Sequence, residues 1–378
     1  MTRLLKTLLI CTVCVTSAIA AEKKKEPQYK HGKISIPGAV ANEPVRKTFS
    51  QDLAVRYVEK GALAWKRARN CVACHTTGSY LQMRPALTPI LGQASKEIRQ
   101  LFVAQRKKYD AQAAKARKKF RVLQKGIRPT EIAYIASGLA EYDAHGAGKT
   151  SPETAAALKL MLNVQSRDGG YGNITCWPPF ESSRYQGATV AAMALATAPG
   201  YLKSVKDKNQ LEKIAKLKSY LRKTKPAHNY ERLILLWADT RWNGLITKER
   251  RNKIIKMVLS KQQADGGWSI RSFGTPDTWG KGSRKNKLQA EKNYKTPDSD
   301  GHQTGLAMIV LLDAGISKDT PAIKKAAKWL LSNQRASGRW WTRSLNTDKS
   351  HFITYSGTLY PLVALQKLGK LKSIVAAE

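Results

Sequence analysis

The sequence is poor in cysteine, in acidic residues and in long apolar runs. It has five cysteines in 378 residues, and 27 Asp and Glu against 66 Lys and Arg, which gives a formal net charge of +39. So few cysteines cannot form a disulfide framework in a chain of this length, and the hydrophobic core must stabilise the fold. No segment reaches about 18 consecutive apolar residues, so the sequence predicts no membrane-spanning helix.

The amino-terminal residues have the pattern of a secretory signal peptide. Arg3 and Lys6 precede a short apolar run, and an A-x-A cleavage pattern ends at Ala20. We therefore predict a cleaved signal peptide at 1–20, followed by a basic extended segment at 21–50. The expected location of the mature chain is periplasmic or extracellular.

The excess of basic residues is partly concentrated in blocks at 106–108 and 115–121. A surface of this charge attracts polyanions in general, although a solvated, lysine-rich helix face is the simpler interpretation. An anionic polymer or a membrane surface is therefore a candidate partner. We expect no nucleic-acid partner, because no motif combines basic and aromatic residues in the way such proteins do.

Three segments share one pattern: Gln, three residues, Gly, one residue and an aromatic side chain. They run from Gln165 to Tyr171, from Gln262 to Trp268 and from Gln334 to Trp340. Each copy ends a helical pattern and precedes a helix rich in small apolar residues. We expect the Gly to relax the backbone after the first helix, the aromatic ring to pack on the neighbouring pair, and the Gln amide to bind backbone at a helix end.

Further helical patterns extend this repeat to about six helix pairs. Two upstream pairs are expected at 51–68 with 80–91 and at 95–124 with 130–142. In an eroded copy, Lys225 replaces the Gln before a helix at 230–238. The sequence therefore predicts an all-α fold, a single α/α-toroid at 51–375 with a long loop at 269–300, because stacked helix pairs can close into a ring.

The last copy of the repeat carries a family resemblance. Its matching residues are Lys325, Ala326, Trp329, Leu330, Gln334, Gly338 and Trp340. They resemble the QW repeat of the squalene-hopene cyclase and protein prenyltransferase superfamily, and the two earlier copies match it more loosely. The resemblance covers residues 150–368, and it implies a terpenoid cyclase-like toroid whose inner helices surround a central cavity.

Cys71, Cys74 and His75 form a C-x-x-C-H motif, the attachment signature of c-type haem. Each thiol can form a thioether with one vinyl group, and the imidazole is then the proximal ligand of the iron. A Cys71–Cys74 disulfide or redox pair is the alternative, whereas a zinc site would need a second C-x-x-C. We predict covalent haem c at the turn 71–75. The surrounding stretch, 65–87, also resembles cytochrome-type segments fused to QW-repeat proteins of planctomycete-like bacteria.

The distal haem ligand has several candidates. Met83 is the nearest thioether, although it fits a core methionine on an inner helix equally well. Loops that lead into inner helices emerge on one face of a toroid, so Cys176, His228, His302 and His351 are expected on the haem side. The three histidines are rival distal ligands. His145 follows an inner helix and belongs to the opposite face.

The catalytic motifs of the superfamily are incomplete in this chain. No D-x-D-D acid motif is present, and the nearest approach, Asp298-Ser299-Asp300, lacks the adjacent carboxylate pair. The resemblance to prenyltransferases implies an alternative zinc site at Asp300, His302 and His351, with His where that family has Cys. An ordinary helix N-terminus, where acidic residues offset the helix dipole, also explains Asp298 and Asp300.

The predicted function is that of an exported haem protein with electron transfer or haem-dependent redox chemistry. Its partner would be a redox protein or an apolar small molecule, held at a mouth that loop 269–300 and the aromatic segment 177–180 help to roof. Two alternatives stay open. One is a cyclase-like binding module for a lipid or an anionic polymer, with a structural haem, and the other is a zinc-dependent, prenyltransferase-like enzyme.

Overall fold

The computed structural model describes residues 26–116, 119–172, 177–180 and 183–375. The predicted signal peptide and Cys176 lie outside these residues. The described chain is mainly helical, with one short hairpin of β1 (Tyr29–His31) and β2 (Ile34–Ile36) near its beginning. None of the helices in the described ranges combines the length and apolarity that a membrane crossing requires.

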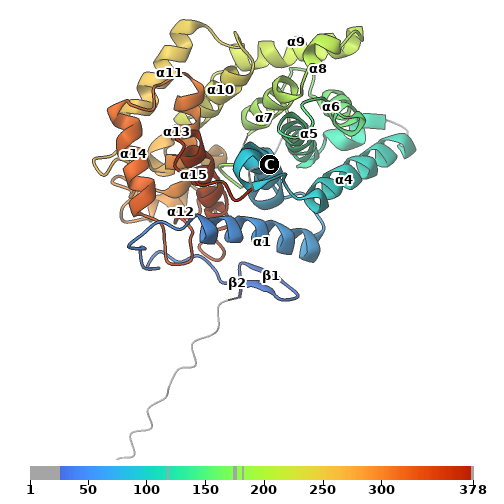
Figure 1. Cartoon of the computed structure of the whole chain (residues 1–378). Helices are drawn as coiled ribbons and strands as arrows, with labels where there is room; N and C mark the ends of the chain where they lie inside the picture. Colours follow the sequence, from blue (N-terminus) through green and yellow to red (C-terminus); the bar gives the residue numbers. More distant parts are fainter. Residues whose placement is uncertain (1–25, 117–118, 173–176, 181–182, 376–378) are drawn as a thin grey trace, which may run out of the picture.

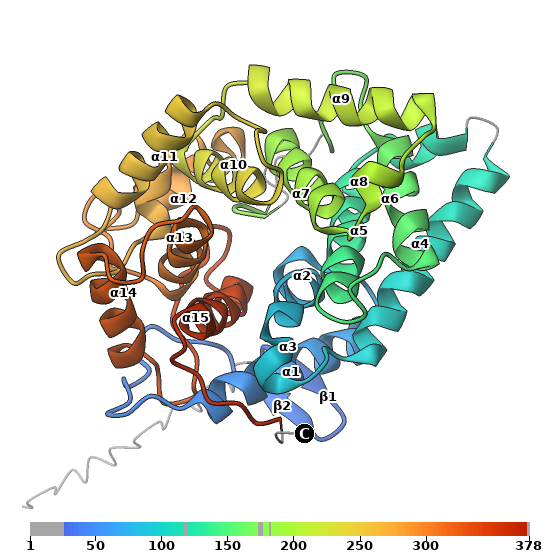
Figure 2. The same cartoon turned by 45° about the horizontal axis from the view of Figure 1, so that its top comes forward.

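The helices form two concentric layers around a centre (Figures 1 and 2). The outer layer consists of α1 (Gln51–Arg69), α4 (Lys96–Lys115), α6 (Pro152–Val164), α9 (Lys208–Lys223), α11 (Lys248–Ser260) and α14 (Pro321–Ser332). The inner layer consists of α2 (Ser79–Met83), α5 (Arg128–Ala144), α7 (Arg184–Thr197), α10 (Asn229–Arg241), α13 (Gly301–Asp313) and α15 (Ser356–Lys367). Inner helices contact one another in chain order, and α15 contacts α2, so the ring closes. The predicted α/α-toroid of six helix pairs is confirmed.

The two layers follow from the distribution of apolar residues along each helix. In the outer helix α14, the buried residues Ile323, Ala326 and Leu330 lie on one side, as expected for an amphipathic helix with one covered face. In the inner helix α13, every residue from Gly301 to Leu311 is buried. A helix that is apolar on all sides must be covered on all sides, which only the inner position provides.

The Gln of each repeat ties neighbouring helix pairs together. The Nε2 atom of Gln262 donates to the carbonyl of Gly266 at 2.8 Å and to that of Ala322, in the next outer helix, at 2.7 Å. Gln334 donates to Gly338 at 2.8 Å and to Ser50, the N-cap of α1, at 2.9 Å. The predicted bond of the Gln amide to backbone at a helix end is confirmed, and Gln334 makes it across the closure of the ring.

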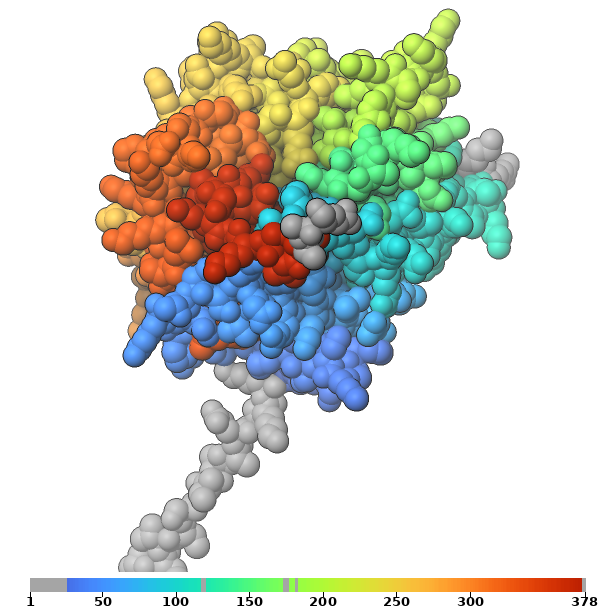
Figure 3. All heavy atoms as spheres, viewed as in Figure 1, coloured from blue at the N-terminus to red at the C-terminus, as the bar shows by residue number. Residues whose placement is uncertain are grey.

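The first and last described segments of the chain meet at this closure. Residues of the first repeat and of the last repeat lie side by side in the space-filling view (Figure 3). The Gln51 Oε1 atom accepts a hydrogen bond from the Lys372 backbone amide at 2.8 Å. Before α1, the segment 26–50 crosses the last repeat, where Val45 and Arg335 form an isolated β-bridge.

Two predicted helices differ in detail from the structure. The first inner helix is broken into α2, η2 (Arg84–Leu87) and α3 (Thr88–Leu91), because Pro85 and Pro89 lack the amide hydrogen that a continuous helix needs. The expected helix at 95–124 ends at Lys115, and a short η3 (Lys119–Gln124) follows.

The connection 269–300 is more ordered than a plain loop. It contains η4 (Ile270–Phe273), η5 (Trp279–Gly282) and α12 (Lys285–Gln289). Phe273, Trp279 and Leu288 are fully buried. The segment is therefore a packed part of the toroid, and its two ends, near Ser269 and Asp300, are the parts that reach the open cleft described below.

Candidate functional site

The C-x-x-C-H motif forms a tight turn between the first outer helix and the first inner helix. The outer helix α1 ends at Arg69, and Asn70 then takes a left-handed conformation with φ of 45°. A π-helical turn, η1 (Cys74–Gly78), leads into α2. The Thr77 hydroxyl closes the turn, because it donates to the carbonyl of Cys71 at 3.2 Å and accepts from the amide of Ala73 at 3.0 Å. The motif thus occupies the position that the glycine turns have in later repeats.

The two thiols of the motif are not joined by a disulfide. Cys74 is buried, and Cys71 is half-buried. Burial raises the pKa of the Cys71 thiol, and the Trp65 side chain beside it offsets part of that effect. Thioether formation requires both thiols in the reduced state.

The His75 imidazole is clamped between two aromatic rings. Phe352 stacks on it with ring centroids 4.7 Å apart and planes 20° apart, and Trp65 meets it edge-on at 4.8 Å. Burial lowers the pKa of His75 to about 4, so the ring is neutral at pH 7. A neutral imidazole is the form that binds a metal ion.

A chain of hydrogen bonds fixes the orientation of this ring. The Nδ1 atom of His75 lies 2.8 Å from the Thr76 hydroxyl, which lies 2.9 Å from the Tyr29 hydroxyl. In the described part of the chain, the Nε2 atom has no hydrogen-bond partner. Metal-binding histidines commonly use one ring nitrogen for such an orienting bond and the other for the metal. The residues around the motif therefore fit a haem iron at Nε2.

The candidate distal ligands occupy different environments. Met83 is buried in the core at the end of α2, so its assignment as distal ligand stays a prediction. His228 is the N-cap of α10, where its Nδ1 atom accepts from the Glu231 amide at 3.2 Å. His302 is fully buried, and both its nitrogens have partners: the Ser356 hydroxyl at 2.8 Å and the Tyr230 hydroxyl at 3.1 Å.

The expected division of histidines between the two faces agrees with the helix ends. His228, His302 and His351 lie at or near the N-terminal ends of α10, α13 and α15, the ends toward which the haem-motif turn also leads. His145 is the C-cap of α5, at the other end of an inner helix.

The residues of the alternative zinc site lie at the entrances of inner helices, and the site stays a prediction. Asp300 caps α13, and its two oxygens accept from the amides of Gln303 at 2.8 Å and Ile270 at 2.7 Å. The Nδ1 atom of His351 accepts from the Ser344 amide at 3.1 Å, and His302 has the partners given above. Among the described residues, no three His, Cys, Asp or Glu side chains are placed to hold a metal ion. The donor atoms are used to stabilise helix entrances instead.

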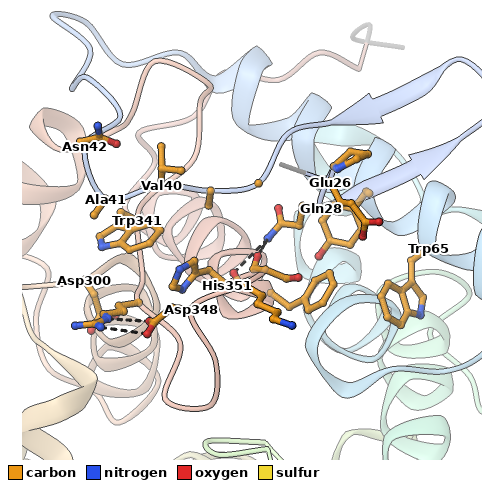
Figure 4. A pocket seen from close by; sticks show the side chains of 18 of the residues that line it. Glu26, Gln28, Val40, Ala41, Asn42, Trp65, Asp300, Trp341, Asp348 and His351 are labelled. Carbon is orange, nitrogen blue, oxygen red and sulfur yellow. Dashed lines mark hydrogen bonds and ion pairs between the residues drawn. The ribbon is translucent and has the colours of Figure 1, made fainter. Parts of the chain in front are cut away.

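An open cleft lies beside the motif, since Trp65 and Phe352 contact His75 and also line the cleft. Figure 4 shows it from close by. Its volume is about 1340 Å³. The N-terminal segment forms one side, through Gln28, Tyr29 and residues 38–42, and the end of α1 contributes Trp65. The segment 341–352 forms the opposite side, so the two aromatic rings that clamp His75 are also walls of the cleft.

Several residues of this site carry no signal of their own in the sequence. Thr76 and Trp65 adjoin the motif, so a search of its neighbours could have found them. Tyr29 and Phe352 come from the two ends of the chain, and only the closure of the ring brings them to His75.

Comparison with known proteins agrees with the architecture. Residues 244–370 match the squalene-hopene cyclase C-terminal domain family. This match agrees with the α/α-toroid described above. No match was found among curated protein sequences.

Glycosidase structures share this toroid. A wild-type glycosidase superposes with a TM-score of 0.54 and 10% sequence identity, over 85% of this chain and 97% of that chain. A glycosidase variant in complex with glucose has the same values. The type II terpene cyclase MstE from Scytonema has a TM-score of 0.46 at 11% identity, over 84% of this chain and 96% of that chain. At this identity, the glycosidase likeness establishes the fold alone.

Proposed function

We propose that this toroid is an exported redox protein that carries one covalently attached c-type haem. Cys71 and Cys74 would form the thioether bonds, and the Nε2 atom of His75 would bind the iron as proximal ligand. The observation that carries the proposal is the state of His75: a neutral ring, held at Nδ1 by Thr76 and on its face by Phe352, with Nε2 left for a ligand.

The surroundings of the motif support a redox role for the bound haem. Tyr29 contacts Tyr57, Trp65, Phe352 and Tyr355 at centroid distances between 5.7 and 6.4 Å. The buried rings of Tyr29, Tyr57 and Tyr355 make this side of the motif apolar, and the polarity around a haem iron influences its reduction potential. The cluster reaches the cleft through Trp65 and Phe352, where a soluble redox partner or a small molecule would approach.

A haem bound here would supply one-electron chemistry, and the protein would supply its position and its dielectric environment. The Thr76 hydroxyl, itself hydrogen-bonded to Tyr29, would orient the His75 imidazole and leave its Nε2 atom for the iron. We propose Met83 as the first candidate for the distal ligand. We also propose that the basic exterior attracts an anionic polymer or a membrane surface.

The deciding experiment is mass analysis of the processed chain after expression with haem-maturation machinery. We expect the wild-type protein to carry the mass of one haem that resists acid-acetone extraction. The variant Cys71→Ala/Cys74→Ala should carry none, whereas the control Cys176→Ala should keep it. Haem that stays attached in the double variant, or its absence from the wild type, would overturn the proposal.

The role of His75 and of electron transfer needs a second measurement. We expect His75→Ala to retain the covalent haem and to change its visible spectrum, because only the axial ligand is lost. Reversible reduction of the wild-type haem at a defined potential by a soluble donor supports electron transfer. If the haem exchanges no electrons, its role is structural, and this part of the proposal is refuted.

A further inference from the structure

The cleft beside the haem motif is larger than a typical small-molecule pocket. Its volume of about 1340 Å³ exceeds the roughly 300 to 1,000 Å³ of typical small-molecule pockets. The residues that line it do not include Cys71, Cys74 or His75. The cleft also extends away from Trp65 as far as Asp300 and Trp341 (Figure 4). It therefore has room for a ligand of its own.

Aromatic side chains stand along this cleft. Figure 4 shows Trp341 and Trp65 on opposite sides of His351. Trp341, Trp65 and Phe352 are each half-buried, so part of every ring remains accessible from the cleft. Trp341 is held in place by His351, which meets it edge-on with centroids 4.6 Å apart. Large aromatic surfaces that are fixed and partly exposed offer flat apolar platforms to a ligand.

The charges of the cleft differ from those of the rest of the molecule. In the whole chain, basic residues outnumber acidic ones by 66 to 27, whereas the cleft is lined by five basic and four acidic residues. Many of them are paired. Arg343 donates to the two carboxylate oxygens of Asp348 at 3.0 and 3.3 Å, and Arg271 donates to Glu291, behind the wall, at 2.6 and 2.9 Å.

This balance excludes two classes of ligand. A polyanion would meet the carboxylates of Glu26, Asp298 and Asp348 within the cleft, while a much more basic surface is available outside it. An apolar lipid would have to cover the charged groups and remove their water, which is unfavourable unless each group has another partner. The cleft instead fits a ligand that is uncharged, has many hydroxyl groups and has flat apolar faces.

We propose that the cleft binds a neutral oligosaccharide. Pyranose rings stack on Trp341 and Trp65 through their C–H faces. Their hydroxyl groups donate to the Asp348 carboxylate and accept from the Arg343 guanidinium. These two groups form one planar ion pair, which matches two adjacent hydroxyls of a sugar. This inference goes beyond the haem proposal and does not depend on it.

The test is calorimetric titration of the full mature chain with neutral hexaoses. The probes are cellohexaose, xylohexaose, maltohexaose, mannohexaose and chitohexaose, with polygalacturonate as the anionic comparison. We expect at least one neutral hexaose to bind with a Kd between about 10 μM and 1 mM. Because the ligand has no charge, the affinity should change little between low and high salt.

Variants connect the binding to the cleft. We expect Trp341→Ala to weaken binding at least tenfold, whereas Trp177→Ala, at an exposed Trp that does not line the cleft, leaves it unchanged. If Trp341→Ala does not fold, Asp348→Ala provides the same test, because this side chain is about half exposed and its removal should weaken binding several-fold.

The outcomes separate this inference from the haem proposal. Titration of Cys71→Ala/Cys74→Ala, which cannot attach haem, should give the same oligosaccharide affinity as the wild type. The inference is overturned if no neutral hexaose binds at about 5 mM, a limit that corresponds to roughly 3 kcal/mol of binding free energy. It is also overturned if Trp341→Ala and Asp348→Ala both bind normally, or if only polygalacturonate binds, with an affinity that falls steeply with salt.

Discussion

Phe352 of the last repeat stacks face to face on His75 of the first, with ring centroids 4.7 Å apart. The contact crosses the closure of the ring, so the imidazole of the haem motif is positioned by the opposite end of the chain. Gln28 reinforces this arrangement, because its amide donates to the carbonyls of Ser350 at 2.8 Å and His351 at 3.2 Å. The environment of His75 is therefore complete only when the ring is closed.

Replacing Phe352 with Ala should loosen the His75 ring. We expect the free energy of unfolding to fall by about 2 kcal/mol, which is below the usual cost for a fully buried Phe because this ring is half-buried. Urea denaturation followed by circular dichroism measures the change. In haem-loaded protein, Phe352→Ala should also alter the visible spectrum, whereas Phe120→Ala, at a half-buried Phe outside the motif, should not. Identical spectra for the two variants would contradict this role.

A pair of glycines tests how closely the repeats pack. Gly338 and Gly315 both have φ of 88°, but a Cβ at Gly338 would lie 2.6 Å from the carbonyl carbon of Leu53, whereas nothing lies within 4 Å at Gly315. Gly315→Ala should cost about 1 kcal/mol of stability, for the left-handed backbone alone. Gly338→Ala should cost about 2 kcal/mol more, because α1 must shift. Equal losses of thermal stability would show that the approach of Leu53 is not limiting.

The amide of Gln334 closes the ring, so its removal should be costly. The Gln334 Oε1 atom accepts from the Ser50 amide at 2.7 Å, and the Nε2 atom donates to the carbonyls of Ser50 and Gly338. Gln334→Ala leaves these buried groups without partners, and we expect a loss of about 3 kcal/mol in denaturant unfolding. The exposed Gln289→Ala is the control and should stay within about 0.5 kcal/mol of the wild type.

Buried histidines should make the haem-free protein sensitive to acid. Burial lowers the pKa of His75, His228 and His351 to about 4 and that of His302 to about 3, from an ordinary value of 6.5. Between these values, the unfolded chain binds more protons than the folded one, so the free energy of unfolding should fall as the pH falls from 6.5 toward 4. Urea unfolding at pH 7.0, 6.0 and 5.0 measures how the free energy of unfolding changes with pH. These pKa values set the pH range in which the change is expected. An unfolding free energy that stays constant over this range would contradict the prediction.

The repeat pattern was sufficient to predict the fold. Gln262 and Gln334 stand at fixed distances from a Gly and an aromatic residue, and these local features define a helix, a turn and a second helix. The break in the first inner helix could also have been predicted from Pro85 and Pro89. The zinc alternative stays a prediction: Asp300 and His302 lie at the entrance of an inner helix, where their atoms bind backbone and hydroxyl groups.

Local order in the chain is enough to specify the helix pairs and the C-x-x-C-H turn, because each depends on residues only a few positions apart. The environment of His75 is a different matter. Its neutral state and its orientation depend on Tyr29, Trp65 and Phe352, which meet only when the sixth pair packs against the first. The cleft likewise needs the N-terminal segment and residues 341–352 on facing sides. Burial and proximity between distant segments are properties of the closed ring, and no spacing in the sequence encodes them.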